Sequence, residues 1–174
     1  MSLLKVFEVP EPILRQKAEK VEKVDDEIAH ILDNMLETMY ATNGVGLAGN
    51  QVGLLKRLVV IDCAGEDQDP DVLQMVNPVI IEHSDETLCK SEGCLSVPRE
   101  YADVERWAQV TVQYLDKKGQ IRTRSAEGLL AKAIQHELDH LEGILFIDYL
   151  SPLKRNKLLK HLEKRRKKEA KEAK

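Results

Sequence analysis

The sequence lacks any apolar run long enough to cross a bilayer, which takes about 20 residues in a helix. Its longest apolar runs, such as "RLVVID" and "LLAKAI", are far shorter. The N-terminal stretch "MSLLKVFEVPEP" lacks the apolar core and the small-residue cleavage site of a secretory signal. These absences argue against a membrane or exported protein, so we expect a cytoplasmic one.

Cysteine is also scarce, with only Cys63, Cys89 and Cys94 in the chain. An odd count without an export signal indicates reduced thiols that pack, bind metal or catalyse, and argues against a disulfide framework. Cys89 and Cys94 are five residues apart, so in an extended chain they face opposite sides. We therefore expect Cys89 in the core, which leaves Cys94 free for a functional role.

Charge is distributed unevenly along the chain. The net charge is −4, yet residues 154–174 hold 11 Lys or Arg against 3 Asp or Glu, which leaves −12 on residues 1–153. The hydrophobic content of 43% suits one compact domain. We predict that domain over residues 1–150 and a basic helical extension over residues 151–174, capped by Ser151 with Pro152 in its first turn.

Hydrophobic periodicity predicts the main elements of the compact domain. Apolar residues recur at intervals of three and four between Asp25 and Ala41, and again over residues 127–141, as in amphipathic helices. Between these helices we predict strands at "RLVVIDC" and "LQMVNPVII", then the hairpin "AQVTVQYLDKKGQIRTRSAEG". Strands joined by hairpins, without crossover helices, indicate an α+β fold with a mostly antiparallel sheet.

The stretch "IQHELDHLEG" carries the clearest chemical signal. Residues four apart lie on one face of a helix, so His136 and His140 can reach the same metal ion. Glu137, one step round the helix, can then touch a water bound to that ion. The alternative is a surface helix whose two histidines are merely solvated.

A catalytic metal site needs a third protein ligand and an open position for water. The candidates are a downstream carboxylate, a cysteine, and the remaining histidines His30, His83 and His161. Glu142 lies two residues beyond His140, so a helix turns it away from the histidine face. Cys94 lies in "SEGCLSVP", a glycine-flanked turn in which the backbone can approach a site closely. We favour Cys94.

Three stretches together resemble the motifs of the bacterial peptide deformylases. They are "GVGLAGNQVG" at 44–53, "EGCLS" at 92–96 and "QHELDHLEG" at 135–143, in the family's order and at similar separations. The resemblance continues through "EPILR" near the start and "LFIDYLSPLKR" near the end, and so covers nearly the whole chain up to the basic tail.

This resemblance implies roles for particular residues. The metal ligands would be Cys94, His136 and His140. Glu137 would be the general acid and base, and Gln51 with the backbone N–H of Leu95 would stabilise the oxyanion. The Gly46 loop would line the substrate cleft, and a pocket for the methionine side chain would be built by Val45, Leu129 and Ala133.

The chain departs from the family pattern at Gly49, where alanine is usual. Glycine gives the loop a more permissive backbone, which raises the question of how rigidly Gln51 is held. A thiolate beside two imidazoles suits iron or zinc alike. The resemblance implies Fe²⁺ as the native metal, with Zn²⁺, Ni²⁺ or Co²⁺ as substitutes.

The implied activity is hydrolytic removal of the formyl group from the N-terminal methionine of newly synthesised polypeptides, with release of formate. The expected partners are N-formylmethionyl nascent peptides and the ribosome, the latter through the basic C-terminal helix, whereas DNA and membranes are not expected. The implied fold packs antiparallel sheets around a central metal-binding helix that carries the HExxH motif, with an N-terminal helix and a C-terminal basic helix.

Three other interpretations remain at this point. An HExxH metallopeptidase would cut internal peptide bonds, and an RNA- or ribosome-binding module would hold a purely structural metal with a fourth protein ligand. "GVGLAG" also fits the dinucleotide-binding pattern, but a helix precedes it and a strand follows it, the reverse of what that pattern requires. Its glycines better suit a loop that pairs with an extended peptide.

Overall fold

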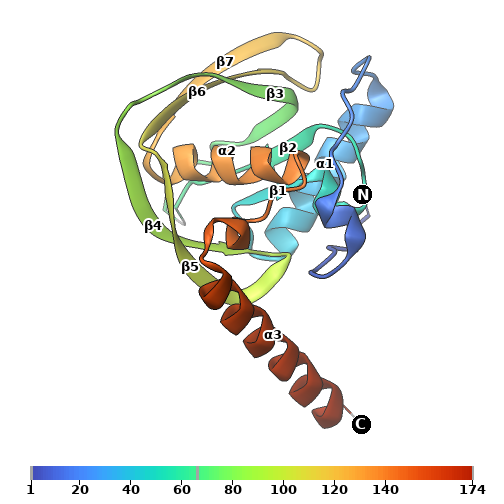
Figure 1. The fold of residues 1–174 in the computed structure, drawn as a ribbon. Coiled ribbons are helices and arrows are strands. Elements are labelled where there is room, and N and C mark those ends of the chain that lie inside the picture. The colour runs from blue at the N-terminus through green and yellow to red at the C-terminus, as the bar shows by residue number, and fades with distance from the viewer. Residues whose placement is uncertain (1, 66, 174) are drawn as a thin grey trace.

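The computed structural model describes residues 2–65 and 67–173 (Figure 1). The first part of the chain forms η1 (Pro12–Arg15), α1 (Asp26–Ala41), β1 (Gly46–Ala48), η2 (Gly49–Val52) and β2 (Leu58–Ile61). The middle is made of the strands β3 (Leu73–His83), β4 (Thr87–Cys94), β5 (Val97–Trp107), β6 (Gln109–Leu115) and β7 (Ile121–Glu127). The last part forms α2 (Gly128–Leu141), η3 (Phe146–Tyr149) and α3 (Pro152–Glu172).

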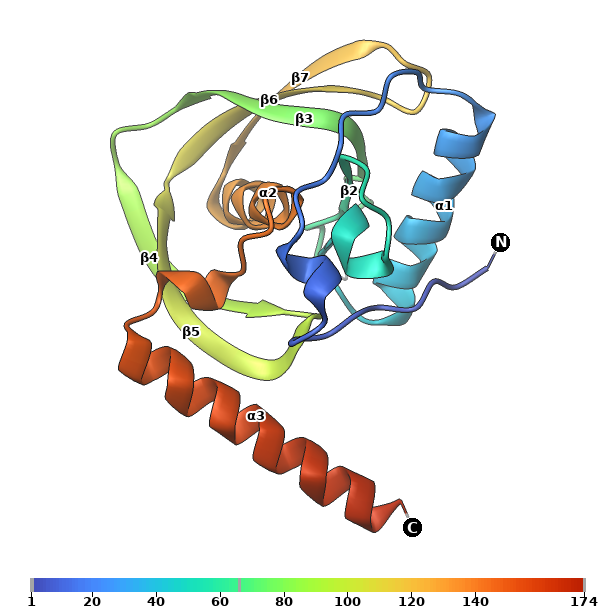
Figure 2. The same cartoon turned by 45° about the vertical axis from the view of Figure 1, so that its right-hand side comes forward.

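The strands form two antiparallel sheets. Five strands pair in the order β1-β2-β3-β6-β7, and β4 pairs with β5 in a separate hairpin. In Figure 2 α2 is seen nearly end-on, with the strands arranged around it. The α+β fold with antiparallel sheets is thus confirmed. Within the described ranges, the helices are too short or too polar to span a membrane.

The two helices predicted in the compact domain form as expected. Asp25 caps α1 by accepting a hydrogen bond of 3.0 Å from the Ile28 amide. The buried face of α2 packs on the five-stranded sheet, and the helix ends at Leu141, two residues before Gly143. Gly143 has φ 74°, and a Cβ there would lie 2.5 Å from the Arg15 carbonyl oxygen, so this close approach of η1 requires glycine.

The basic helix α3 starts where the sequence predicted, with the Ser151 side chain capping the Lys154 amide. Leu158 and Leu162 are buried in a cluster shared with the N-terminal segment, β5 and η3. Leu153, by contrast, is 81% exposed. One face of α3 is therefore packed on the rest of the chain, while the C-terminal end of the helix extends beyond the sheets (Figure 1).

The β4–β5 hairpin is the part of the fold that the sequence did not reveal. The sequence predicts only a glycine-flanked turn around Cys94, whereas β5 alone has 11 residues. The expectation that Cys89 lies in the core was wrong, because Cys89 is exposed. It lies on β4 opposite Glu105, which is exposed as well.

Candidate metal centre and substrate cleft

Three potential metal ligands converge beside α2. The Cys94 Sγ atom lies 3.3 Å from His140 Nε2, and that nitrogen lies 3.2 Å from His136 Nε2. All three atoms lie within 4.8 Å of one another. A tetrahedral ion with bonds of about 2.0 to 2.3 Å separates its ligands by roughly 3.3 to 3.7 Å, so this set fits a divalent cation.

Two elements supply these ligands. His136 and His140 lie one turn apart on α2 and project from the same face. Cys94 ends β4, where the register with β5 shifts and pairs Cys94 with Val97 across a tight turn. The irregularity turns the strand end toward α2, which is a common use of broken pairing beside functional sites.

The other candidate ligands lie elsewhere. His30 is exposed on α1, and the His83 ring stacks on Trp107 with centroids 3.8 Å apart. His161 lies beside Glu100, 2.9 Å away. Glu142 forms an ion pair with Arg57, consistent with its predicted direction away from the histidines.

Glu92, for which the sequence predicts no role, orients the ring of His136. Its Oε2 accepts a hydrogen bond of 2.8 Å from His136 Nδ1, which leaves Nε2 of the same ring for the metal. Burial alone would raise the pKa of Glu92, but hydrogen bonds from His136 and Arg106 lower it to about 2. Glu92 and Cys94 are two residues apart on β4, so alternation along the strand could have signalled a shared face.

Arg106 connects Glu92 to the outside of the molecule. Its Nε donates to Glu92 at 2.7 Å, and its Nη1 donates to Asp139 at 2.6 Å. Tyr149 donates to the same Asp139 carboxylate at 2.7 Å and lies under the guanidinium. Each of these buried or half-buried charges therefore has a hydrogen-bond partner. The network holds Glu92, and through it the His136 ring, in one orientation.

The two histidines differ in proton affinity. Burial lowers the pKa of His136, but the Cys94 thiol and Glu92 outweigh it and raise that pKa well above its ordinary value. Burial and the neighbouring His136 together lower the pKa of His140 well below its ordinary value. A proton and a metal ion would therefore compete for this set of ligands.

Glu137 is buried beside the ligands, with 4% of its surface exposed. Its Oε2 has no hydrogen-bond partner among the described residues, and burial raises its pKa to about 7. A Cβ on Gly46 would lie 2.5 Å from Oε1 of this carboxylate. Glycine at position 46 is thus what lets edge strand β1 approach the acid.

Gln51 is held firmly in spite of Gly49. Its Oε1 accepts from the Ala48 amide at 2.9 Å, and its Nε2 donates to Ser96 Oγ at 3.1 Å and lies 3.5 Å from Cys94 Sγ. A Cβ at Gly49 would lie 2.6 Å from the Lys56 carbonyl oxygen, so glycine accommodates a close loop. The departure at Gly49 serves packing and does not loosen Gln51.

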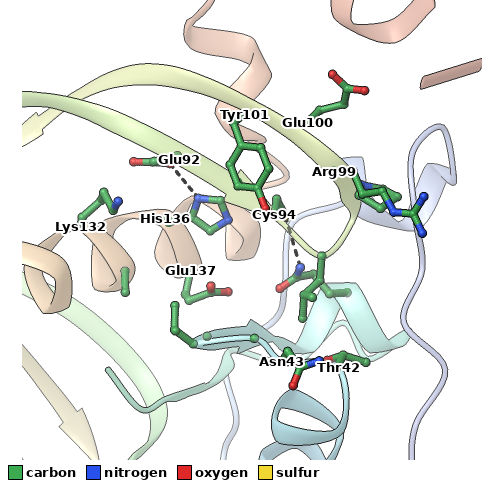
Figure 3. Close-up of a pocket in the computed structure, with 18 of the residues that line it drawn as sticks. Thr42, Asn43, Glu92, Cys94, Arg99, Glu100, Tyr101, Lys132, His136 and Glu137 are labelled. Carbon is green, nitrogen blue, oxygen red and sulfur yellow. Dashed lines mark hydrogen bonds and ion pairs between the residues drawn. The ribbon is translucent and has the colours of Figure 1, made fainter. Parts of the chain in front are cut away.

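A cavity of about 490 Å³ opens over these groups (Figure 3). It brings together all the residues expected to touch substrate: Val45, Gly46, Gln51, Leu95, Leu129 and Ala133. Sequence reasoning missed the remaining wall, which includes Thr42, Asn43, Arg99, Glu100, Tyr101 and Lys132. Most of these belong to the β4–β5 hairpin or lie at the end of α1, so only tertiary structure brings them to the cleft.

A family model described as polypeptide deformylase matches residues 3–156. The chain belongs to the polypeptide deformylase family. The peptide deformylase of Phenylobacterium zucineum is 49% identical over 164 residues, which are 94% of this chain and 97% of that relative. The one from Maricaulis maris is 46% identical over 94% of each chain. The similarity therefore spans nearly the full length of this chain and of both relatives.

Solved deformylases share the fold. The crystal structure of peptide deformylase from Ehrlichia chaffeensis has a TM-score of 0.92 at 38% identity, and the match covers 97% of this chain and 99% of that one. A second structure of that protein, in complex with actinonin, has a TM-score of 0.90 at 40% identity over 95% and 98% of the two chains. The chain is therefore an enzyme of the deformylase family with the deformylase fold.

Proposed function

We propose that this deformylase hydrolyses the formamide of N-formylmethionyl peptides at a divalent ion held by Cys94, His136 and His140. The observation that carries the proposal is the convergence of these three ligand atoms beside the unpaired carboxylate of Glu137. When bound, the ion lowers the pKa of a coordinated water and polarises the formyl oxygen. With three protein ligands, one position stays open for that chemistry.

Glu137 transfers the proton in this scheme. A carboxylate whose pKa is about 7 can accept a proton from the attacking water at neutral pH. The water oxygen bonds to the formyl carbon, the carbon–nitrogen bond breaks, and Glu137 gives the proton to the departing nitrogen. The products are formate and a neutral amine, which is a far better leaving group than an amide anion.

Gln51 and Leu95 stabilise the negative charge on the former formyl oxygen. The Gln51 amide is fixed by Ala48 and Ser96, so it needs no reorganisation when that charge develops. The Leu95 backbone N–H supplies the second donor, from the turn that follows Cys94. In comparable oxyanion holes, one such donor contributes a factor of about 10² to 10³ in rate.

The peptide binds along the edge of the five-stranded sheet. Strand β1 is the terminal strand of that sheet and lines the cavity through Gly46. An extended substrate can add to such an edge through backbone hydrogen bonds. Val45, Leu129 and Ala133 line the same cavity and offer apolar surface to the methionine side chain. Actinonin, which occupies the Ehrlichia chaffeensis relative, is an appropriate competitor for this cleft.

Ferrous iron is the proposed native metal, with Zn²⁺, Ni²⁺ or Co²⁺ as substitutes. The support is the mixed donor set of one thiolate and two imidazoles, which suits these borderline ions. A thiolate next to a redox-active ion is open to oxidation. The iron form should therefore lose activity during aerobic incubation while the Ni²⁺ form retains it, and equal decay of both would refute the assignment.

Formate release tests the proposed reaction. Protein purified without oxygen should release formate from formyl-Met-Ala-Ser and leave Met-Ala-Ser intact. Cleavage of the unformylated tripeptide would favour the metallopeptidase alternative. No release by a protein that carries one equivalent of metal would favour the structural-metal alternative.

We also propose that α3 docks on the ribosome in the cytoplasm, with residues 1–150 as the catalytic domain and residues 151–174 as the docking extension. The side of α3 opposite Leu158 and Leu162 carries exposed lysines at positions 157, 160, 164, 167 and 168. Ribosomal RNA supplies the complementary phosphates. Each lysine that neutralises a phosphate releases counterions, so binding weakens with salt.

Charge removal tests this docking. Lys160→Gln with Lys164→Gln should reduce the slope of log affinity against log salt by about 1.5 in ribosome pelleting. The matched control replaces Lys20 and Lys23, two exposed lysines far from α3 in the chain. Identical pelleting by both double variants at every salt concentration would rule out docking through this face.

A further inference from the structure

The arginines of α3 face the opposite way from its exposed lysines, toward the cleft wall. Arg165 forms an ion pair with Glu100 and donates to the Pro98 carbonyl oxygen at 2.9 Å. His161 also lies against Glu100, 2.9 Å away. Pro98 and Glu100 both line the substrate cavity. The segment from Pro98 to Tyr101, here called the rim, is therefore fastened to α3 from behind.

Strand alternation explains how one segment serves both sides. Successive residues of β5 point to opposite faces, so Glu100 is buried while Tyr101 is exposed. In Figure 3 Tyr101 points toward Cys94, and Glu100 points away from His136 and Glu137. The contacts of α3 with Glu100 therefore hold the neighbouring Tyr101 side chain in a defined position in the cleft.

Arg166 fastens a second segment. It donates to the Val9 carbonyl oxygen at 2.5 Å and forms an ion pair with Glu8 at 2.7 Å. The Val9 amide in turn donates to the Ser96 carbonyl oxygen at 2.9 Å. The residues 7–9, here called the strap, also reach the oxyanion region, because the Phe7 amide donates to the Gln51 carbonyl oxygen at 2.7 Å.

We propose that Arg165 and Arg166 are positioning residues of the peptide cleft, acting through the rim and the strap. The inference rests on the proposed deformylase reaction and adds that α3 is a structural part of substrate binding, besides any docking role. Neither arginine touches the reacting atoms, so their contribution belongs to the binding of the peptide beyond its formylmethionine. The ligand class concerned is an extended peptide whose second and third residues run along the rim.

A split between KM and kcat tests the proposal. Arg165→Gln should raise the KM for formyl-Met-Ala-Ser about tenfold, the equivalent of one lost hydrogen bond to a charged group. Its kcat should stay within about twofold, because Glu137 and the ligands are untouched. The KM for formyl-Met-Ala should rise less. Arg166→Gln tests the strap alone, and because the Arg166 and Glu8 side chains are 35% and 44% exposed, the substitution leaves no fully buried charge unpaired.

Controls separate this inference from the proposed reaction. The double variant Lys20→Gln with Lys23→Gln removes exposed charge elsewhere and should match wild type. Hydrogen exchange should accelerate at the amides of the rim in Arg165→Gln and of the strap in Arg166→Gln. If both arginine variants had the wild-type KM for both peptides and the wild-type rates of hydrogen exchange, the positioning role would be overturned. An inactive wild-type protein would instead overturn the proposed reaction.

Discussion

The helices α2 and α3 differ in whether their polar side chains are buried or exposed. In α2 the polar side chains Gln135, His136, Glu137 and His140 are all buried. In α3 the buried residues are two leucines, and the charged side chains stay largely in water. A buried polar group depends on each partner it has, whereas an exposed charge acts mainly through the net field. The two helices should therefore respond differently to substitution.

The largest effect is expected from the acid at the centre of α2. Glu137→Gln keeps the shape of the side chain but cannot carry the proton, so kcat should fall by a factor of about 10² to 10⁴. Metal content should stay at the wild-type value, because Glu137 is not among the three converging ligands. Steady-state formate release and elemental analysis on the same sample give both quantities. Loss of metal with loss of activity would make Glu137 a ligand.

The leucines of α3 come next, since they are the part of that helix that resembles α2. Leu162 is 3% exposed and Leu153 is 81% exposed. Leu162→Ala should lower the free energy of unfolding by about 2 to 5 kcal/mol, through lost burial and the cavity it leaves. Leu153→Ala should change it by less than about 0.5 kcal/mol. Denaturant unfolding measures both, and equal midpoints would mean that α3 is not packed.

Loss of the carboxylate that orients His136 should weaken metal binding more than it destabilises the fold. Glu92→Gln removes the carboxylate that orients the His136 ring, and affinity for the ion should fall about 10- to 100-fold. Glu105→Gln, on the exposed face of the same hairpin, is the matched control. Competition against a chelator measures the dissociation constants. Equal constants for the two variants would remove Glu92 from the metal centre.

The smallest effect is expected at the hydrogen bond between Tyr40 and Asp62, which is partly buried and so lies between the buried polar groups of α2 and the exposed charges of α3. Tyr40 is 46% exposed and donates to the buried Asp62 at 2.6 Å. Burial and this hydrogen bond raise the pKa of Tyr40 to about 12 from 10.0, so the contact stabilises the fold below pH 10 and is lost as pH rises through 12.

The hydrogen bond from Tyr40 to Asp62 also makes stability depend on pH in the acid range. Burial would raise the pKa of Asp62, but hydrogen bonds from Tyr40, Ala64 and Asp71 outweigh it and lower the pKa below 3.8. Their stabilisation is fully present above that pH and is lost as pH falls through the folded-state pKa. Tyr40→Phe should therefore cost about 1 kcal/mol at pH 7 and less at both extremes. A cost that does not vary with pH would indicate a packing effect.

The sequence predicted α2 and its candidate metal ligands because their signals are local. Two histidines one turn apart depend only on helical geometry, and Cys94 lies in a glycine-flanked turn that can be read from a few neighbours. The same holds for the apolar periodicity of α1 and for the Ser151 cap at the start of α3. The family resemblance then added Gln51 and Leu95, for which spacing alone gave no role.

What the sequence did not reveal depends on distant pairing. Glu92 acquires its role from His136, 44 residues away, and Arg106 acquires its role from Glu92 and Asp139. Cys89 was misplaced because its exposure depends on whether another layer covers β4. The fastening of the rim by Arg165 joins residues more than 60 positions apart. Composition marked that arginine only as part of a basic tail.

The most direct test of the account is an anomalous scattering map from crystals of the metal-loaded protein. We predict one peak within about 2.0 to 2.3 Å of Cys94 Sγ and of Nε2 in both His136 and His140, with the fourth position free of protein atoms. Glu137 should lie beside that open position without a bond to the ion. A fourth protein ligand, or a peak away from these three atoms, would contradict the catalytic metal centre described above.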